Sequence, residues 1–140
     1  MTKEILSKNN IRINCESVSS DEAIIAVGKL LQDSGYINEK YIDGMLERDH
    51  SLTTYIGNDV AIPHGEFESK EHVLHTGISI MIYPDGIPWG DGNVRIVVGI
   101  ASQNDDHMEI LAEIAIKLSD MKEVEKIVTG SVDDIYNTFR

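Results

Sequence analysis

Residues 93–102 read NVRIVVGIAS, a run in which nearly every residue is apolar. A strand with one face in water alternates apolar and polar residues, whereas a strand covered on both faces is apolar almost throughout. We therefore predict that this run is a central strand of a sheet, with other elements packed on both of its faces.

Shorter strand patterns precede this run, and residues 68–75 fit a helical turn or a loop. The strands are expected at residues 10–14, 52–57, 60–63 and 76–84. Pro84, Asp85 and Gly86 are residues typical of turns, and we expect them to end the last of these strands.

Helical patterns alternate with the strands. Ser19 and Glu22 match a capping box, and the helix that follows is expected to end near Ser34 and Gly35. Further helices are expected at residues 37–49, 105–120 (capped by Asn104), 121–130 and 131–139. The alternation predicts an α/β fold with a mixed β-sheet flanked by helices, in a single domain over residues 1–140.

Helical spacing also predicts which side chains face the core. They are Ala23, Ile24, Val27, Leu30 and Leu31 in the first helix, Tyr41, Ile42 and Met45 in the second, and Met108, Leu111, Ala112, Ala115 and Leu118 in the third.

Composition limits the classes of function. The chain has 140 residues and a formal net charge of −12. That charge argues against nucleic acid and anionic membranes as partners, since phosphates need basic surfaces. It is compatible with a basic protein partner, or with a role in solubility alone. A lone Cys15, no secretory signal and no apolar run long enough to insert in a membrane favour the cytoplasm.

Common enzyme motifs are absent. The sequence has no GxxxxGK[ST] loop, no GxGxxG after a strand and no GxSxG, so we expect no nucleotide cofactor. His72 and His75 have a spacing that could hold a metal on one helix face, but no Cys supports such a site. His50 follows a polar junction and is expected at the surface. Cys15 is expected to be a buried or bystander thiol.

Three residues together suggest chemistry. His64 lies between Pro63 and Gly65, which constrain the backbone and could present the ring to a visiting molecule or simply form a turn. His107 follows the candidate cap Asn104, near a helix start that favours anions, or is an ordinary first-turn polar residue. Arg48 ends the second helix, where a cation is favourable in any case. As a set they fit a nucleophilic imidazole with donors for a phosphoryl group, without a metal.

Three segments carry a resemblance over nearly the whole chain. They are MLERDHSLTTYIGNDVAIPHG (45–65), GISIMIYPDGIPWG (77–90) and VRIVVGIASQNDDHMEIL (94–111). In this order they resemble the enzyme IIA domain of the mannitol/fructose class of the sugar phosphotransferase system. The chain length is similar to that of the mannitol branch in which this domain is a free chain.

The resemblance implies a phosphotransferase that works through a phosphohistidine and needs neither cofactor nor metal. It implies that His64 accepts phosphate from phospho-HPr and passes it to a cysteine of the mannitol IIB component, with Arg48 and His107 as active-site residues. The other nitrogen of His64 would be held by a local hydrogen bond. HPr would approach with a basic surface.

Several alternatives stay open. A nitrogen-regulatory enzyme IIA shares the fold and the histidine but acts by binding targets, and a non-catalytic metal- or ligand-binding module would use His72 and His75. Ile62, Phe67 and Ile80 fit either the core or a contact rim, as does Trp89.

Overall fold

The computed structural model describes residues 5–65, 71–102 and 106–139, and the side chains of 106–108 lie outside the description. Its elements are a short 3₁₀ turn (Lys8–Asn10), β1 (Ile11–Arg12), α1 (Ser20–Asp33), α2 (Glu39–Ser51), β2 (Tyr55–Gly57), β3 (Val60–Ala61), β4 (Gly77–Trp89), β5 (Gly92–Ala101), α3 (Asp106–Lys117), α4 (Met121–Thr129) and α5 (Val132–Phe139). In this part of the chain, no helix is both long and apolar enough to cross a membrane.

The sheet is mixed, and β5 lies at its centre. The strand order is β1-β4-β5-β3-β2. Strands β1 and β4 are parallel, as are β3 and β5, whereas β4 and β5 form an antiparallel hairpin. This arrangement confirms both the mixed sheet and the central place predicted for NVRIVVGIAS.

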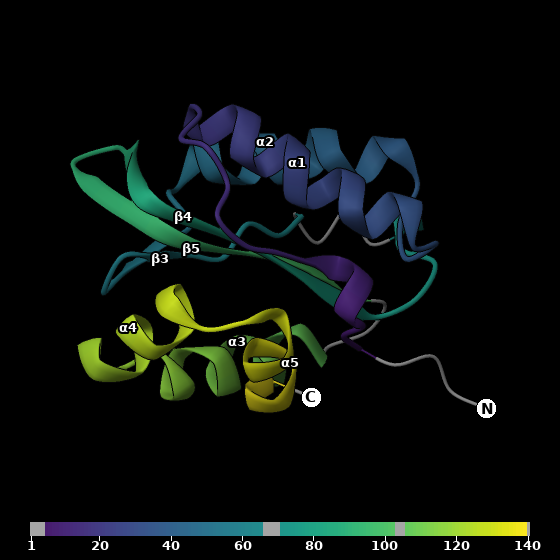
Figure 1. Cartoon of the computed structure of the whole chain (residues 1–140). Helices are drawn as coiled ribbons and strands as arrows, with labels where there is room; N and C mark the ends of the chain where they lie inside the picture. The colour runs from purple at the N-terminus through teal and green to yellow at the C-terminus, as the bar shows by residue number, and fades with distance from the viewer. Residues whose placement is uncertain (1–4, 66–70, 103–105, 140) are drawn as a thin grey trace.

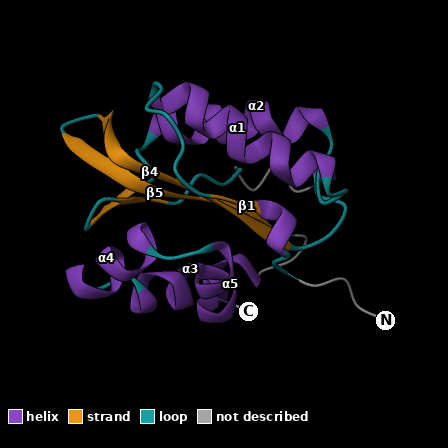
Figure 2. Ribbon diagram, in the orientation of Figure 1, coloured by secondary structure: helices purple, strands orange, loops and turns teal. Residues whose placement is uncertain are grey.

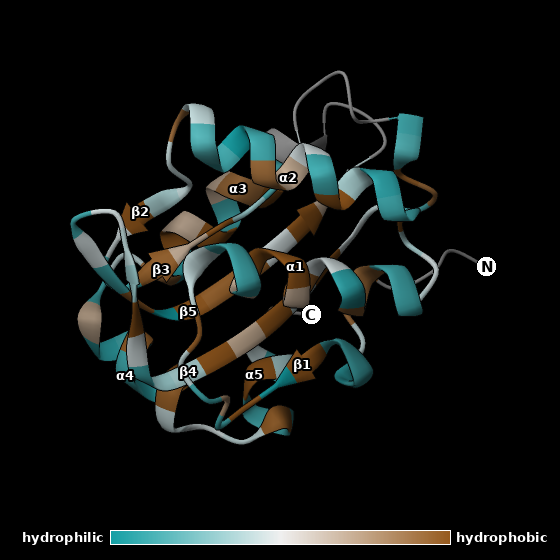
Figure 3. Ribbon diagram, turned by 90° about the horizontal axis from the view of Figure 1, so that it is seen from above, coloured by the Kyte–Doolittle hydropathy of each residue, from teal (hydrophilic) through white to brown (hydrophobic). Residues whose placement is uncertain are grey.

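Helices cover both faces of the sheet. Helices α1 and α2 lie on one face, and α3, α4 and α5 lie on the other (Figures 1 and 2). The side chains of β5 alternate between two cores: Val97 and Ala101 face α1 and α2, while Ile96, Val98 and Ile100 face the other layer. Seen over α1, the hydrophobic residues concentrate in β4 and β5 (Figure 3). Burial on both faces therefore explains why β5 is apolar throughout.

Side chains cap the first turns of helices α1, α2 and α4. The capping box is present, because the Ser19 side chain accepts from the Glu22 amide and Glu22 reaches back to the Ser19 amide. Asn38 and Asp120 cap α2 and α4 through their side chains in a similar way. The inward residues predicted for α1 and α2 are buried, except that Leu30 is half-buried.

The turn predicted at residues 84–86 is wrong. Strand β4 continues through them to Trp89, and its register against β5 shifts between Ile82 and Ile87. Gly86 has a φ of +79°, and the Ser17 hydroxyl donates to its carbonyl at 2.7 Å. The turn residues thus form a bulge that bends a long strand. The hairpin closes later, at Gly90.

The predicted inward face of α3 is also partly wrong. Leu118 is buried and Leu111 half-buried, but Ala112 and Ala115 are exposed, while Ile114 is buried instead. Met108 lies outside the described side chains. Helix α3 is apolar around most of its circumference, so spacing alone fits several faces. Burying isoleucine removes more apolar area from water than burying alanine, which selects the observed face.

We expect Ile114→Ala to lower the free energy of unfolding by about 2–4 kcal/mol, because it leaves a cavity under α3. Ile116 is 73% exposed on the same helix, and Ile116→Ala should change stability by no more than about 0.5 kcal/mol. Urea unfolding followed by tryptophan fluorescence measures both. Equal losses in the two variants would contradict the assigned face.

Candidate active site

His64 extends the line of β3 along the end of β5. It forms an isolated parallel bridge with Ile100, and the Ile100 amide donates to the Pro63 carbonyl at 2.9 Å. His64 therefore lies at the carboxyl ends of two parallel strands. In open α/β sheets this is the edge at which ligands bind.

One ring nitrogen of His64 is held by the backbone. Nδ1 lies 2.7 Å from the carbonyl oxygen of Ile62, in a half-buried position. A carbonyl oxygen only accepts, so Nδ1 must carry the proton. In the neutral ring the lone pair is then on Nε2. This is the local hydrogen bond that the resemblance implies, and it leaves Nε2 as the ring atom able to act as a nucleophile.

Tyr41 of α2 fixes the next peptide. The Gly65 amide donates to the Tyr41 hydroxyl at 2.8 Å, and that hydroxyl donates to the Ile100 carbonyl at 2.8 Å. Tyr41 is buried, and burial raises its pKa to about 12, so the hydroxyl stays protonated. Sequence reasoning placed this side chain inward but missed the role of its hydroxyl, since spacing predicts burial and says nothing of partners.

Gly65 is required for a different reason from the one suggested by the sequence. It is not among the described glycines with positive φ. A Cβ at Gly65 would lie 2.5 Å from a ring carbon of Tyr41. Glycine is therefore needed for close approach to the aromatic ring, and the turn itself makes no special demand on it.

Arg48 lies in the last turn of α2, as expected. It is half-buried and follows Tyr41 by two helical turns, so it continues the same face of the helix. Its Nη1 donates to the carbonyl of Leu52, the residue that ends the helix. Two residues later the Thr54 carbonyl accepts from the Ile62 amide at 3.0 Å. Arg48 therefore bonds to the carbonyl of Leu52, two residues before Thr54, and His64 bonds to the carbonyl of Ile62. The backbone hydrogen bond between Thr54 and Ile62 joins these two segments.

His107 lies in the first turn of α3, which begins at Asp106. Because β5 ends at Ala101, this turn follows the same end of the sheet as His64. The His107 side chain, its expected cap Asn104 and Phe67 lie outside the described residues. The structure therefore describes the side chains of His64 and Arg48, and the placement of the His107 ring beside them is a proposal.

The remaining histidines make ordinary surface contacts. His50 Nε2 lies 2.8 Å from Asp21 Oδ1, and the hydrogen bond to this carboxylate raises the His50 pKa. His72 contacts Asn38 and Glu71, and His75 is exposed. Within residues 5–65, 71–102 and the described side chains after 108, no group of three or more metal-ligating residues is found.

Several residues that fit either the core or a contact rim in the sequence lie in the core. Ile80 is fully buried and Ile62 is 7% exposed, so both belong to the core under α3–α5 rather than to a rim. Trp89 is 2% exposed and packs in the other core. Cys15 is half-buried, and burial raises the pKa of its thiol, which fits a bystander.

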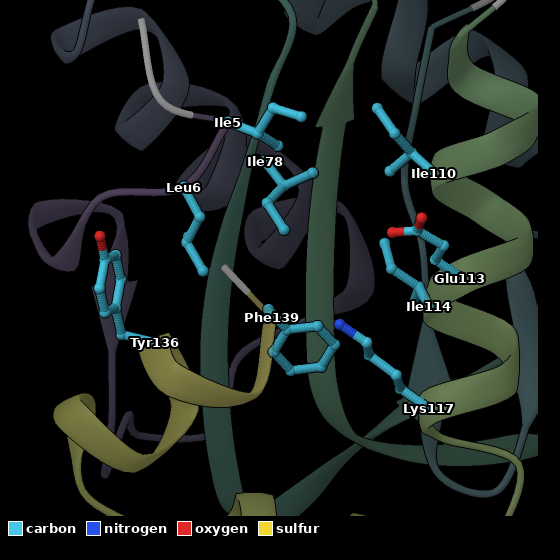
Figure 4. A pocket seen from close by; sticks show the side chains of 9 residues that line it. All are labelled: Ile5, Leu6, Ile78, Ile110, Glu113, Ile114, Lys117, Tyr136 and Phe139. Atoms are coloured by element: carbon cyan, nitrogen blue, oxygen red, sulfur yellow. The ribbon is translucent and has the colours of Figure 1, made fainter.

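A cavity of about 390 Å³ lies elsewhere, between α3, α5 and the start of the chain (Figure 4). Its lining is mainly apolar, with Ile78, Ile114 and Phe139, and its charged groups are Glu113 and Lys117. Lys117 is already engaged by the Thr138 carbonyl at 2.8 Å. Neither Arg48 nor His64 lines this cavity, so it is not the candidate site.

We expect Tyr41→Phe to destabilise the fold by about 1–3 kcal/mol, because it leaves the Gly65 amide and the Ile100 carbonyl without their partner. Hydrogen exchange of the Gly65 amide should become faster. Tyr55→Phe is the control, since the hydroxyl of Tyr55 makes no hydrogen bond among the described contacts. If Tyr41→Phe behaved like the control, the hydroxyl would not hold the turn.

Comparison with known proteins identifies the family. Residues 4–140 match the family described as the phosphoenolpyruvate-dependent sugar phosphotransferase system, EIIA 2. The mannitol-specific phosphotransferase enzyme IIA components of Geobacillus stearothermophilus and Bacillus subtilis are both 42% identical, over 96% and 94% of this chain and 93% and 92% of theirs.

Solved structures agree in fold. The IIA mannitol structure from Escherichia coli matches with a TM-score of 0.89 at 32% identity, over 96% of this chain and 99% of that one. A complex of the Escherichia coli mannitol enzymes IIA and phosphorylated IIB matches with a TM-score of 0.90 at 32% identity, over 96% of each chain. With the family match spanning residues 4–140, the chain belongs to the EIIA 2 family of the sugar phosphotransferase system.

Proposed function

We propose that this chain is, as one domain, the phosphoryl carrier of a mannitol phosphotransferase system. It accepts phosphate from phospho-HPr on His64 and passes it to a cysteine of the mannitol IIB component. The observation that carries the proposal is the Nδ1 hydrogen bond of His64 to Ile62, which leaves the lone pair of the neutral ring on Nε2. Relatives at 42% identity with mannitol-specific names support the sugar.

The two transfers use the same atom. In the first, the Nε2 lone pair attacks phosphorus, the phosphorus–nitrogen bond of phospho-HPr breaks, and that electron pair returns to the HPr ring. In the second, the IIB thiolate attacks phosphorus and the bond to Nε2 breaks. Nδ1 stays protonated in both transfers. The ring is therefore neutral while it acts as the nucleophile and cationic once Nε2 carries the phosphoryl group, and this positive charge favours departure of the group.

Charge around phosphorus has to be stabilised in both steps. The transferring group carries diffuse negative charge on its three outer oxygens. We assign its donors to the Arg48 guanidinium, the His107 ring and the amides at the start of α3. None of these assignments requires a cofactor.

A related complex and the net charge of the chain support the proposed partners. The solved complex of the related Escherichia coli IIA with phosphorylated IIB supports a IIB acceptor. The net charge of −12 suits a basic donor surface such as the one expected of HPr. We propose that the chain acts in the cytoplasm. The nitrogen-regulatory protein IIA-Ntr from Neisseria meningitidis, at 22% identity and a TM-score of 0.82, shares the fold alone.

His64→Ala should abolish phosphate acceptance and leave the fold intact, because it removes the nucleophile from a half-buried turn. The test is incubation with phosphoenolpyruvate, enzyme I and HPr, scored by acid-labile, base-stable phosphate. His72→Ala and His75→Ala are the controls and should accept phosphate at the wild-type rate. Stoichiometric phosphate on the His64 variant would refute the assignment, and a loss in either control would favour a metal- or ligand-binding module.

Arg48→Lys should slow transfer by about 100- to 1,000-fold while HPr still binds, because the charge stays and the fork of donors is lost. Stopped-flow transfer from phospho-HPr measures this rate. Arg12→Lys, at an exposed arginine of β1, is the matched control. A wild-type rate in the Arg48 variant would leave Arg48 with only its helix-end role.

His107→Ala should slow onward transfer to IIB more than it lowers the extent of phosphorylation. The amides at the start of α3 can still hold a ground-state phosphate, whereas one donor is lost in the transition state. Single-turnover transfer to IIB, compared with the final level of phosphoprotein, separates the two effects. Equal reductions in both would mean that His107 acts in binding only.

A further inference from the structure

One carboxylate oxygen accepts three hydrogen bonds next to the candidate site. Asp49 Oδ1 accepts from the Thr54 amide at 2.9 Å, from the Thr54 hydroxyl at 2.6 Å and from the Trp89 indole N–H at 2.9 Å. Thr54 and Trp89 are both 2% exposed, so these donors are shielded from water. Hydrogen bonds to an ionised acceptor are the strong ones. Asp49 therefore fixes Thr54 firmly to the end of α2.

Thr54 in turn is bonded to the residue that orients His64. Its carbonyl accepts from the Ile62 amide at 3.0 Å, and the Ile62 carbonyl accepts from His64 Nδ1 at 2.7 Å. A continuous path thus runs from Asp49 through Thr54 and Ile62 to the imidazole. Each link in this path is either a hydrogen bond of 3.0 Å or less or the backbone of one residue.

The sequence makes this path one of two supports for the carbonyl that accepts from His64. The Ile62 carbonyl belongs to the peptide that joins Ile62 to Pro63, and proline has no N–H. That peptide cannot be held by a hydrogen bond of its own donor. Its orientation depends on the peptides on either side, which are bonded to Thr54 and to the Ile100 amide. Movement of Thr54 would therefore tilt the carbonyl that selects the tautomer.

We propose that Asp49 is a positioning residue that keeps His64 in the Nδ1-protonated tautomer, by fixing Thr54 against Ile62. Its effect on phosphoryl transfer rests on the function proposed above, whereas its effect on the tautomer does not. Asp49 acts through backbone groups and does not touch the phosphoryl group.

The test compares Asp49→Ala with Asp49→Asn, which keeps an acceptor oxygen, and with Asp120→Ala. Asp120 caps α4 with one exposed side-chain hydrogen bond on the opposite face of the sheet, so it controls for the loss of a carboxylate at a helix end. The first readout is the ¹⁵N spectrum of the histidine rings at a pH where His64 is neutral, with His64 assigned by comparison with His64→Ala. The second is the split of transfer from phospho-HPr into kcat and KM.

We expect Asp49→Ala to change His64 from one tautomer to a mixture and to lower kcat about 10- to 100-fold at unchanged KM, because a misplaced nucleophile loses its alignment. Asp49→Asn should fall between this variant and the wild type in both readouts. The single indole N–H signal should shift in both Asp49 variants, because Trp89 is the only tryptophan. Asp120→Ala should keep the wild-type tautomer and kcat.

A wild-type tautomer and kcat in a folded Asp49→Ala would overturn the proposal and leave Asp49 a structural residue. If Asp49→Ala does not fold, Asp49→Asn decides by the same two readouts. The proposed function fails separately: the wild-type chain would then take no phosphate on His64, while a tautomer change in the Asp49 variants would still support positioning.

Discussion

The burial of β5 on both faces is the constraint on which the rest of the structure depends. Every side chain from Ile96 to Ala101 is buried, so this strand needs a helical layer above and below it. Its fixed position gives the candidate site a rigid base, since the backbone of Ile100 bonds both to Pro63 and to the Tyr41 hydroxyl. The histidine turn is therefore attached to the most buried strand of the fold.

The site is organised by backbone groups more than by side chains. Ile62 is bonded through its amide to Thr54 and through its carbonyl to His64, while Gly65 is bonded to Tyr41. Such an arrangement resists local unfolding, because moving the histidine turn means breaking its hydrogen bonds to Thr54, Tyr41 and Ile100. In the proposed transfer, a ring that keeps its orientation would lose little freedom on reaching the transition state. This explains how a half-buried loop can present one nitrogen reproducibly.

The features predictable from sequence are those with a local physical cause. The capping box, the continuous apolar run and the spacing of Tyr41, Ile42 and Met45 each depend on neighbours in the chain, and each was confirmed. The hydrogen bond of His64 to the Ile62 carbonyl, two residues earlier, is implied by the resemblance and is equally local.

Features that depend on tertiary partners were missed. Residues 84–86 have turn composition, yet pairing with β5 makes them a bulge inside a strand. The small size of Gly65 is required by the Tyr41 ring, which lies 24 positions away in sequence. Asp49 looks like a polar helix end, yet its carboxylate accepts from the buried Trp89, 40 positions further on. The spacing of residues along the chain does not predict such contacts between distant positions.

Two arginines of this acidic chain have contrasting surroundings. Arg95 is bound by the carboxylates of both Asp59 and Glu125, at 2.8 and 2.6 Å, so its charge is committed to the fold. Arg48 forms no ion pair among the described residues and donates instead to the neutral Leu52 carbonyl. There it offsets the partial negative charge at the end of α2.

Asp49, the neighbour of Arg48, has the opposite arrangement. Successive helical residues point about 100° apart, so the two charges diverge. The Asp49 carboxylate turns into three buried donors, which keeps its negative charge off the site side of the helix. Arg48 is left with an exposed contact to a neutral acceptor, and in the proposed function a charged phosphoryl oxygen would replace this carbonyl as the stronger acceptor. The end of α2 thus separates an anion held by three hydrogen bonds from a cation held by one exposed contact.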